Sequence, residues 1–282
     1  MKFETMTEDH LEDAQALTTS FNWPHTVEDW SFAFELGTGR VLYNEGRLLG
    51  TCLTWNLGPD LSTLGLLAVA REAQGQGLGR AFLQQAIEEQ AGKTILLHAT
   101  HQAIDLYGSQ SFEAIGEVRQ HQGVVLPATS PATPMCTPHV HACEAPITSA
   151  QADKLLALDH EATGLDRSTL LSALLPRSKI WVTGRQEHPK GYALIRPFGR
   201  GHVVGPVIAS GEDDAQALIN AMLGANTGRF VRIDITEEFN LSGWLVGLGL
   251  SEVDRVLAMS NGPVPEGSGR LKRFALIGHA FG

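Results

Sequence analysis

The sequence LAVAREAQGQGLGR (Leu67–Arg80) joins an apolar, strand-like run to a glycine-rich turn and the start of an amphipathic helix. Gly75, Gly77 and Gly79 allow the backbone to turn tightly and a ligand to approach it closely. A helix that begins at Leu78 directs unpaired N–H groups and the positive end of its dipole toward this turn. Together these features predict a cradle for an anionic phosphate group.

Two common phosphate-binding motifs do not match this spacing. A P-loop has a Lys-Ser/Thr pair after its last glycine, whereas this chain has Arg80 and Ala81 there. A dinucleotide-binding turn is followed by an acidic residue about 20 positions further on. At that distance this chain reads His98-Ala99-Thr100, so it offers no carboxylate to a ribose. The cradle is therefore of another type.

The spacing of the cradle resembles the acyl-CoA site of the GNAT acetyltransferases, whose signature is Gln/Arg-x-x-Gly-x-Gly/Ala. Gln74, Gly77 and Gly79 match it in register, and Val69 stands where the family has the strand residue that pairs with pantetheine. The resemblance implies that acetyl-CoA, or another short acyl-CoA, is the cosubstrate. The residues that it assigns to CoA binding are Leu67, Ala68, Val69, Gln74, Gly75, Gln76, Gly77, Leu78, Gly79, Arg80, Thr100, Ala103 and Tyr107.

A second segment, THQAIDLYGSQSF, runs from Thr100 to Phe112 and resembles the family's Asn-x-x-Ala-x-x-x-Tyr-x-x-x-Gly-Phe helix. Ala103, Tyr107 and Phe112 match this motif. The chain departs from it at two positions, where Asn is replaced by Thr100 and Gly by Ser111. The resemblance implies that Tyr107 is the general acid that protonates the departing thiolate, and that the acetyl group passes directly to the acceptor.

The order of the predicted elements indicates an α/β (α+β) fold built from two similar parts. Each part is expected to hold a mixed, mostly antiparallel twisted sheet that is flanked by helices. The resemblance implies that the central strands at 64–69 and 93–99 splay apart and admit the acyl-pantetheine between them. We predict that residues 113–125 close the first sheet as a hairpin.

The composition between Pro127 and Pro146 changes to Pro, Thr, Ser and Ala, which predicts a linker rather than a helix or a central strand. We therefore expect a catalytic, acyl-CoA-binding domain at 1–126, a linker at 127–146 and a second GNAT-like domain at 147–282. In the second domain the acidic run Glu212–Asp214 lies where a cradle needs free N–H groups. Carboxylates there repel a pyrophosphate, so we expect this domain to be degenerate, with a structural or substrate-site role.

This pairing resembles a tandem-GNAT subfamily that is found mostly in bacteria. Four short strings have the look of that subfamily: Trp23-Pro24-His25, Glu28-Asp29-Trp30, Arg119-Gln120-His121-Gln122-Gly123 and Asp166-Arg167-Ser168. With them, the resemblance covers nearly the whole chain.

The bulk composition of the 282-residue chain indicates a cytoplasmic enzyme. Its net charge of -10 argues against a nucleic-acid partner, because binding to phosphate backbones needs a basic face. No apolar run approaches the roughly 20 residues that span a bilayer, and no signal-peptide pattern is present, so we expect no membrane partner. The three cysteines lack Cys-x-x-Cys spacing, which predicts neither a disulfide framework nor a metal site. We expect a monomer or a homodimer.

Acetyl transfer to an amine also requires a group that accepts the amine proton. His98, near the end of the strand that faces the thioester, and Glu28, near the loop that covers acceptor substrates in the family, are the candidates. Both also fit structural roles, as a strand histidine and as an acid in the first turn of a helix. The candidate acceptor-binding residues, for which core packing or helix capping is the alternative, are Trp23, His25, Asp29, Trp30 and Asp166.

The sequence therefore predicts an acetyl-CoA-dependent N-acetyltransferase that acts on a primary amine of a small amine or an amino-acid-like molecule. Two other hypotheses remain open at this stage. One is an acyl-CoA-binding sensor without turnover, and the other is a protein or peptide N-acetyltransferase. An acceptor pocket that is roofed by the second domain would favour a small molecule, whereas an open groove would favour a protein.

Overall fold

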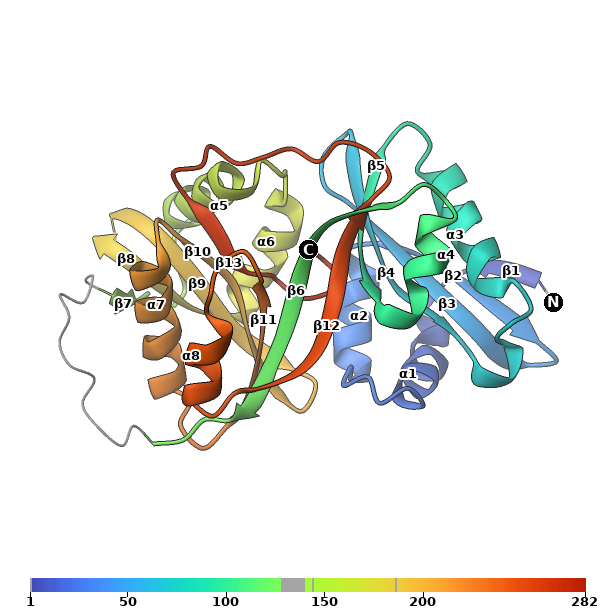
Figure 1. Cartoon of the computed structure of the whole chain (residues 1–282), viewed down its shortest axis with the longest axis horizontal. Helices are drawn as coiled ribbons and strands as arrows, with labels where there is room; N and C mark the ends of the chain where they lie inside the picture. Colours follow the sequence, from blue (N-terminus) through green and yellow to red (C-terminus); the bar gives the residue numbers. More distant parts are fainter. Residues whose placement is uncertain (1, 128–139, 144, 186) are drawn as a thin grey trace.

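The computed structural model describes residues 2–127, 140–143, 145–185 and 187–282 (Figure 1). We call residues 2–127 the first half and the described residues from 140 onward the second half. The strands form one sheet of 13 strands in the order β1-β2-β3-β4-β5-β12-β6-β11-β13-β10-β9-β8-β7. The predicted mixed sheet with flanking helices is confirmed, because most neighbouring strands run antiparallel.

The first half contains six strands and four α-helices. They are β1 (Lys2–Thr5), α1 (Leu11–Thr19), α2 (Val27–Glu35), β2 (Thr38–Asn44), β3 (Arg47–Asn56), β4 (Leu61–Val69), α3 (Leu78–Glu89), β5 (Thr94–Thr100), α4 (Ile104–Gly108) and β6 (Glu113–Val124). The described part of the second half repeats much of this order. It contains β7 (Val140–Ala142), α5 (Ser149–Thr163), α6 (Ser168–Leu174), β8 (Lys179–Arg185), β9 (His188–Phe198), β10 (Gly201–Ala209), α7 (Glu212–Gly224), β11 (Phe230–Thr236), α8 (Ser242–Gly247), β12 (Ser251–Ser260) and β13 (Lys272–Ala275).

Local sequence signals explain where several helices begin and end. At the start of α2 the Thr26 hydroxyl accepts a hydrogen bond from the backbone N–H of Asp29, and the Asp29 carboxylate accepts one from the N–H of Thr26. This reciprocal pair is a capping box, which satisfies two N–H groups that the helix leaves free. Helix α5 begins with the same device and ends at Gly164, whose φ of +69° a glycine adopts without strain.

Each half contains one parallel strand pair that is joined through a helix. In the first half β4 pairs with β5 through α3, and in the second half β10 pairs with β11 through α7. A parallel pair needs such a crossover, because a tight turn cannot reverse the chain twice. The two units β4-α3-β5 and β10-α7-β11 are therefore the equivalent parts of the two halves.

The halves exchange their next strands. Strand β12 of the second half pairs with β5 of the first, β6 of the first half pairs with β11 of the second, and the two exchanged strands pair with each other. Figure 1 shows them running side by side through the middle of the molecule. The prediction of a hairpin over residues 113–125 was wrong, because this segment is one strand of 12 residues that is paired along both of its edges.

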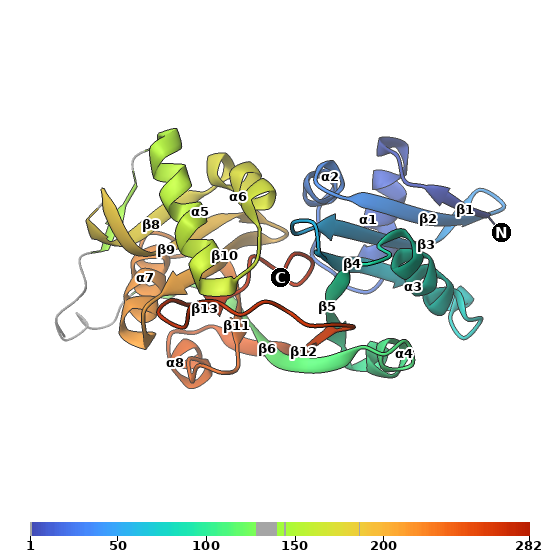
Figure 2. The same cartoon turned by 90° about the horizontal axis from the view of Figure 1, so that it is seen from above.

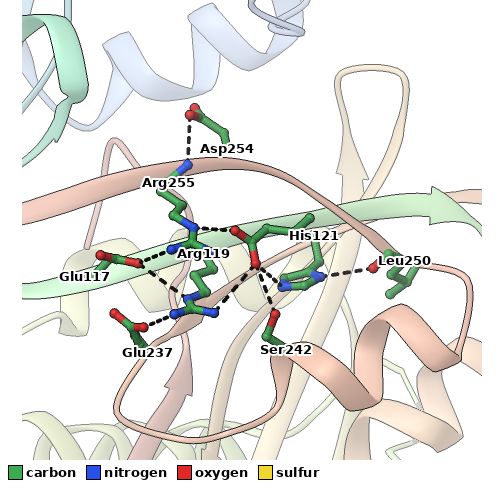
Figure 3. Close-up of polar contacts among 9 residues, drawn as sticks. Glu117, Arg119, His121, Glu237, Ser242, Leu250, Asp254 and Arg255 are labelled. Carbon is green, nitrogen blue, oxygen red and sulfur yellow. Dashed lines mark hydrogen bonds and ion pairs between the residues drawn. The ribbon is translucent and has the colours of Figure 1, made fainter.

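A polar cluster holds the exchanged strands on one face of the sheet (Figure 3). Arg119 of β6 forms ion pairs with Glu117, Glu237 and Glu252, which come from β6, the β11–α8 connection and β12. Beside it the fully buried His121 donates a hydrogen bond from Nδ1 to the Leu250 carbonyl, at 3.0 Å. Because these partners lie far apart in sequence, the cluster fixes β6 against β12.

The backbones approach closely at the end of the same joint. A Cβ atom at Gly123 would lie 2.3 Å from the Gly249 carbonyl oxygen, which no side chain tolerates. Within Arg119–Gly123, Arg119 and His121 lie on the face of the polar cluster. Gln120 and Gln122 point to the other face, and Gly123 permits the close backbone contact.

The predicted linker at 127–146 is described only in part. Residues 128–139 and 144, which include Cys136 and His139, lie outside the described residues. Val140–Ala142 forms β7, which pairs with β8 at the end of the sheet, so this part of the segment is a strand. An edge strand tolerates prolines close by, because only one of its edges is paired.

The apolar core continues from one half into the other. Trp30 and Trp55 are buried, and their indole N–H groups donate to the Thr18 hydroxyl and the Ala33 carbonyl. Phe281, from the last described segment, packs its ring 4.9 Å from that of Trp55. Figure 2 shows this end of the chain, marked C, between the two halves. No helix in the described ranges is long and apolar enough to span a bilayer.

A buried ion pair anchors the last segment. Both oxygens of the Asp159 carboxylate accept from the Arg167 guanidinium, at 2.9 and 2.7 Å, and both side chains are fully buried. Arg167 also donates to the Gly282 carbonyl at 2.7 Å, and the Tyr192 hydroxyl donates to Asp159 at 2.7 Å. The string Asp166-Arg167-Ser168 thus carries a structural cation.

Replacing Arg167 with Met leaves the Asp159 carboxylate buried without its cation. We expect Arg167→Met to lower the free energy of unfolding by about 3–5 kcal/mol, as measured by urea denaturation. Arg177→Met is the matched control, because Arg177 pairs with Glu35 at 3.2 Å while both side chains are about half exposed. That change should lower it by no more than about 1 kcal/mol. Equal effects of the two variants would contradict the structural role of Arg167.

Candidate active site

The glycine-rich turn has the backbone shape that a phosphate cradle needs. Gly75 and Gly77 have φ angles of +75° and +80°, in the left-handed region that favours glycine, and Gly77 caps α3 without a side chain. The first turn of α3 carries no acidic residue, so its free N–H groups and helix dipole meet no competing charge. The Gln74 side chain donates to the Val69 carbonyl at 3.0 Å and ties the turn to β4.

The central strands of the first half splay apart, as expected. Strands β4 and β5 pair only from Leu61 opposite Thr94 to Leu64 opposite Leu97. Beyond this point β4 still pairs with β3, and β5 pairs with β12 on its other side. The facing edges of β4 and β5 therefore diverge, and the segment with Leu67, Ala68 and Val69 offers an unpaired edge to an extended ligand.

The corresponding opening in the second half is filled. Strands β10 and β11 pair from His202–Val204 to Val231–Ile233 and then diverge, and β13 of the same chain pairs with both beyond that point. Helix α7 begins with Glu212, Asp213 and Asp214, so carboxylates stand where the first half presents free N–H groups. The second half therefore retains the framework of the cradle without an opening or an anion site.

A cavity of about 380 Å³ lies where the two halves meet, which is within the usual size of a ligand site. The first half contributes the loop before α2, part of α2, the β4–β5 opening and two glutamines of β6. The lining residues from it are Phe21, Asn22, Trp23, Pro24, His25, Asp29, Phe32, Ala33, Gly65, Leu66, His98, Thr100, Gln120 and Gln122. The second half supplies Arg196, Phe198, Val203, Arg232, Asp234, Val253, Asp254, Val256, Ile277, Gly278, His279, Ala280 and Phe281.

His98 presents an unprotonated ring nitrogen inside this site. Its Nδ1 lies 2.9 Å from the His279 carbonyl, and since a carbonyl only accepts, Nδ1 carries the proton. The Nε2 lone pair is buried and has no partner among the described groups. Burial lowers the pKa of His98 to about 3, so the ring is neutral at physiological pH.

The charged floor of the cavity comes from β11. Asp234 is fully buried and accepts two hydrogen bonds from Arg232, both at 2.8 Å. Its pKa is lowered although burial alone would raise it, because Arg232 stabilises the carboxylate. His279 Nε2 lies 3.5 Å from the same carboxylate, and burial lowers the pKa of that ring to about 4.

Trp23 and His25, two of the predicted acceptor-binding residues, reach the cavity from the loop before α2. The His25 ring meets Phe198 of β9 edge to face, with centroids 5.1 Å apart, and Arg232 lies 5.5 Å from the centroid of the same phenyl ring. Burial lowers the pKa of His25 to about 3, and its Nδ1 has no partner among the described groups. Asp29 also reaches the cavity and accepts from the Gly199 N–H at 2.9 Å, which links α2 to the second half.

Besides Tyr107, three of the predicted catalytic and acceptor-binding residues lie outside the cavity. Trp30 is fully buried in the core, which corrects its assignment as an acceptor contact. Glu28 is exposed in the first turn of α2, where hydrogen bonds to the N–H of its own residue and to Thr26 lower its pKa, so a structural role fits it better than that of a base. Asp166 accepts from the N–H and hydroxyl of Ser168 at 3.2 and 2.6 Å and caps α6, which was the alternative interpretation.

Tyr107 lies beside the cradle rather than in the wall of the cavity. Helix α4 packs against β5 and α3, and a Cβ atom at Gly79 would lie only 3.3 Å from Leu106. Burial raises the pKa of the Tyr107 hydroxyl above its usual range, so this group stays protonated. Thr100, at the start of the same motif, does line the cavity.

Sequence reasoning missed five polar residues of the second half that line the cavity: Arg196, Arg232, Asp234, Asp254 and His279. A signal existed for three of them. Arg196 follows the apolar run Tyr192–Ile195, and Arg232 and Asp234 alternate with apolar residues in Phe230–Ile235. A charge inside a buried strand is costly unless it is paired or used, which marks such positions for function. His279 follows the last strand and carries no comparable signal.

In the described residues, no group of three or more His, Cys, Asp or Glu side chains converges in a way that could hold a metal ion. Cys52 is a buried free thiol in β3, and burial raises its pKa. An apolar strand position of this kind fits packing rather than acyl transfer.

Comparisons with known proteins agree with this geometry. Two family models, both described as an acetyltransferase (GNAT) domain, match residues 26–128 and 155–271. The chain belongs to the GNAT acetyltransferases, with two GNAT domains in tandem. It is therefore an acyltransferase, and its family uses acetyl-CoA as cosubstrate.

A curated relative and several solved structures resemble the chain over most of its length. YitH of Bacillus subtilis (strain 168), named an uncharacterized N-acetyltransferase, is 28% identical, with 98% of this chain and 96% of the relative covered. A structure of a candidate acetyltransferase from Pyrococcus horikoshii has a TM-score of 0.79 at 19% identity. The match covers 100% of this chain and 95% of the other chain. A tandem GNAT protein from the clavulanic acid biosynthesis pathway has a TM-score of 0.66 at 13% identity. This match covers 94% of this chain and 99% of the other chain. At these identities the two structures establish the fold alone.

Three histidines that line the cavity make folding sensitive to acid. An unfolded chain protonates His25, His98 and His279 near pH 6.5, whereas the folded protein does so near 3, 3 and 4. The free energy of unfolding should therefore fall as the pH drops from 6.5 to 5, by about 1.4 kcal/mol per pH unit for each proton that only the unfolded chain binds. Urea denaturation at several pH values measures this slope.

His279→Gln removes one of the three groups that only the unfolded chain protonates. It should reduce the slope by up to about 1.4 kcal/mol per pH unit. His101→Gln, at an exposed position, is the control and should leave it unchanged. A stability that does not vary between pH 6.5 and 5 would contradict the neutral state of the buried rings.

A carboxylate placed in the cradle should weaken the binding of acetyl-CoA. Gln76→Glu adds a negative charge between Gly75 and Gly77, and we expect the Kd for acetyl-CoA to rise about 5- to 10-fold at low salt, as measured by calorimetry. Gln84→Glu adds the same charge at an exposed position further along α3 and should change the Kd less than about twofold. Equal effects of the two variants would mean that the phosphates bind elsewhere.

Proposed function

We propose that this protein transfers the acetyl group of acetyl-CoA to the primary amine of a small molecule. The observation that carries this proposal is the cavity between the halves, which contains the unprotonated Nε2 of His98 beside the unpaired edges of β4 and β5. A pantetheine arm that pairs with the β4 edge would bring its thioester to this opening. The cradle at Gln74–Gly79 would hold the pyrophosphate on the N-terminus of α3.

In the proposed reaction the amine nitrogen attacks the thioester carbonyl carbon, a C–N bond forms and the C–S bond breaks. His98 Nε2 accepts the proton that the nitrogen loses, directly or through one water. The tautomer suits this role, because the hydrogen bond from Nδ1 to the His279 carbonyl leaves Nε2 free to accept. A nitrogen that bonds to carbon becomes strongly acidic, so a weakly basic imidazole suffices.

Tyr107 is proposed to donate its proton to the departing sulfur. Its raised pKa keeps the hydroxyl protonated up to alkaline pH, which is the state that a general acid needs before the reaction. Its helix packs on the first turn of α3, next to the cradle that would hold the cosubstrate. The hydroxyl regains its proton from solvent after the thiol leaves.

The enclosure of the cavity supports a small acceptor rather than a protein. The second half and the segment Ile277–Phe281 line the side of the site opposite the cradle half. A cavity of about 380 Å³ with walls from both halves suits a small molecule better than a polypeptide. The Tyr107 motif and the free Nε2 of His98 support turnover rather than a sensor that only binds acyl-CoA.

An acceptor screen tests the proposal. Purified protein is incubated with acetyl-CoA and a panel of amino acids, simple amines, polyamines, aminoglycosides and peptides, and the release of free thiol is followed. Tyr107→Phe and His98→Gln should each lower kcat by about 10²- to 10⁴-fold and leave the Kd for acetyl-CoA within about twofold. His101→Gln, at an exposed position close to His98 in sequence, is the control and should retain full activity. Acetyl-CoA binding without turnover on any acceptor would favour the sensor, and turnover on peptides alone would favour a protein acetyltransferase.

A further inference from the structure

Arg196 is a buried cation in the cavity that forms no ion pair or hydrogen bond with a described carboxylate, and Asp29 and Asp234 raise its pKa only through longer-range attraction. Its Nη2 donates to the Ile277 carbonyl at 3.0 Å, while Nη1 is buried and without a hydrogen bond to any described group. No described carboxylate lies within 4.0 Å of its guanidinium nitrogens. Burial lowers the pKa of Arg196 to about 10, so the side chain is still charged at neutral pH.

The carboxylates around the cavity are engaged elsewhere or lie at its rim. Asp234 is held in a two-point pair by Arg232, and Asp29 accepts from the N–H groups of Thr26 and Gly199. Asp254 is exposed and accepts from the N–H of Arg255. Arg196 therefore differs from Arg232, whose charge is already neutralised.

A buried charge without a counter-ion is strongly unfavourable, so a ligand that supplies an anion would gain from meeting it. Guanidinium N–H groups match the geometry of a carboxylate, and such charge-assisted hydrogen bonds are strong. The free Nη1 therefore marks an anion subsite in the wall of the cavity.

The anion subsite and the base are anchored to one short segment. Arg196 donates to the carbonyl of Ile277 and His98 to that of His279, at 3.0 and 2.9 Å. Carbonyls two residues apart are separated by no more than about 7 Å. Both side chains also line the same cavity, so one small molecule bound there can contact both.

We infer that the acceptor carries a carboxylate, bound by Arg196, in addition to the amine that is acetylated near His98. The acceptor is then an amino acid or a related amino-carboxylic acid. This inference rests on the proposed function and specifies its substrate class. The aromatic rings of Trp23, Phe198 and Phe281, which also line the cavity, offer apolar surface to the remainder of such a molecule.

The first test uses the unaltered protein and matched acceptors. Phenylalanine is compared with phenylalaninamide and phenethylamine, and leucine with leucinamide and isoamylamine. We expect kcat/KM to be about 10- to 100-fold higher for the carboxylates, because a hydrogen bond to a charged group is worth about 1.5–3 kcal/mol. Taurine and O-phosphoethanolamine are included as amines with other anions. A preference for either of these, or for the amines that lack a carboxylate, would overturn the inference.

The second test changes the cation. Arg196→Met should lower kcat/KM for amino acids about 10- to 100-fold. The values for amines that lack a carboxylate and the Kd for acetyl-CoA should remain nearly unchanged. Arg196→Lys keeps the charge without the planar fork and should retain part of the preference. Arg200→Met, at an exposed position on the β9–β10 turn, is the control and should alter none of these values.

The outcomes separate the inference from the proposed function. Acetyl transfer that is equally fast to amines and amino acids, and insensitive to Arg196→Met, overturns the carboxylate subsite but leaves the proposed function standing. Absence of acetyl-CoA binding and of transfer to every acceptor overturns the proposed function itself. If Arg196→Met does not fold, as judged by circular dichroism, the matched acceptors on the unaltered protein still decide the inference.

Discussion

The backbone hydrogen bonds of the two exchanged strands hold the halves of this protein in one fixed relation. Strand β6 pairs with β11 and β12 pairs with β5, so neither half completes its sheet with its own strand. The remaining contacts depend on this arrangement, because it sets loops from one half opposite strands of the other. The capping residue Asp29, which also binds Gly199 across the boundary, shows one side chain serving both helix and interface. The cavity exists only because both sets of walls meet.

The two halves share a framework and divide the chemistry. In the first, diverging strands and an uncharged helix start leave room for an extended, phosphorylated ligand. In the second, β13 occupies the equivalent opening and acidic residues begin the helix. The chain that leaves β13 then carries Ile277 and His279 into the cavity, where their carbonyls accept from Arg196 and His98. The second half thus orients side chains of the candidate active site.

The sequence made the local structure predictable and left the pairing hidden. The cradle followed from glycine spacing, which acts within a few residues. The exchange of β6 and β12 did not follow, because alternation identifies the buried face of a strand but not its neighbour. Tyr107 was found by its motif. Arg196 and Asp234 were missed although they interrupt apolar strands, because the sequence alone does not show that these strands border a cavity. Trp30 was misassigned because an aromatic residue near a binding loop fits the core equally well.

The exchanged strands also restrict how this chain can be divided or recombined. A fragment that ends before β11 would leave the edge of β5 bare and β6 without either of its neighbours. Bare strand edges invite pairing with other chains, so such a fragment would be prone to aggregate. The first half is consequently not a portable module, although the sequence motifs of the cradle lie within one continuous stretch. The two halves therefore fold and function as one unit.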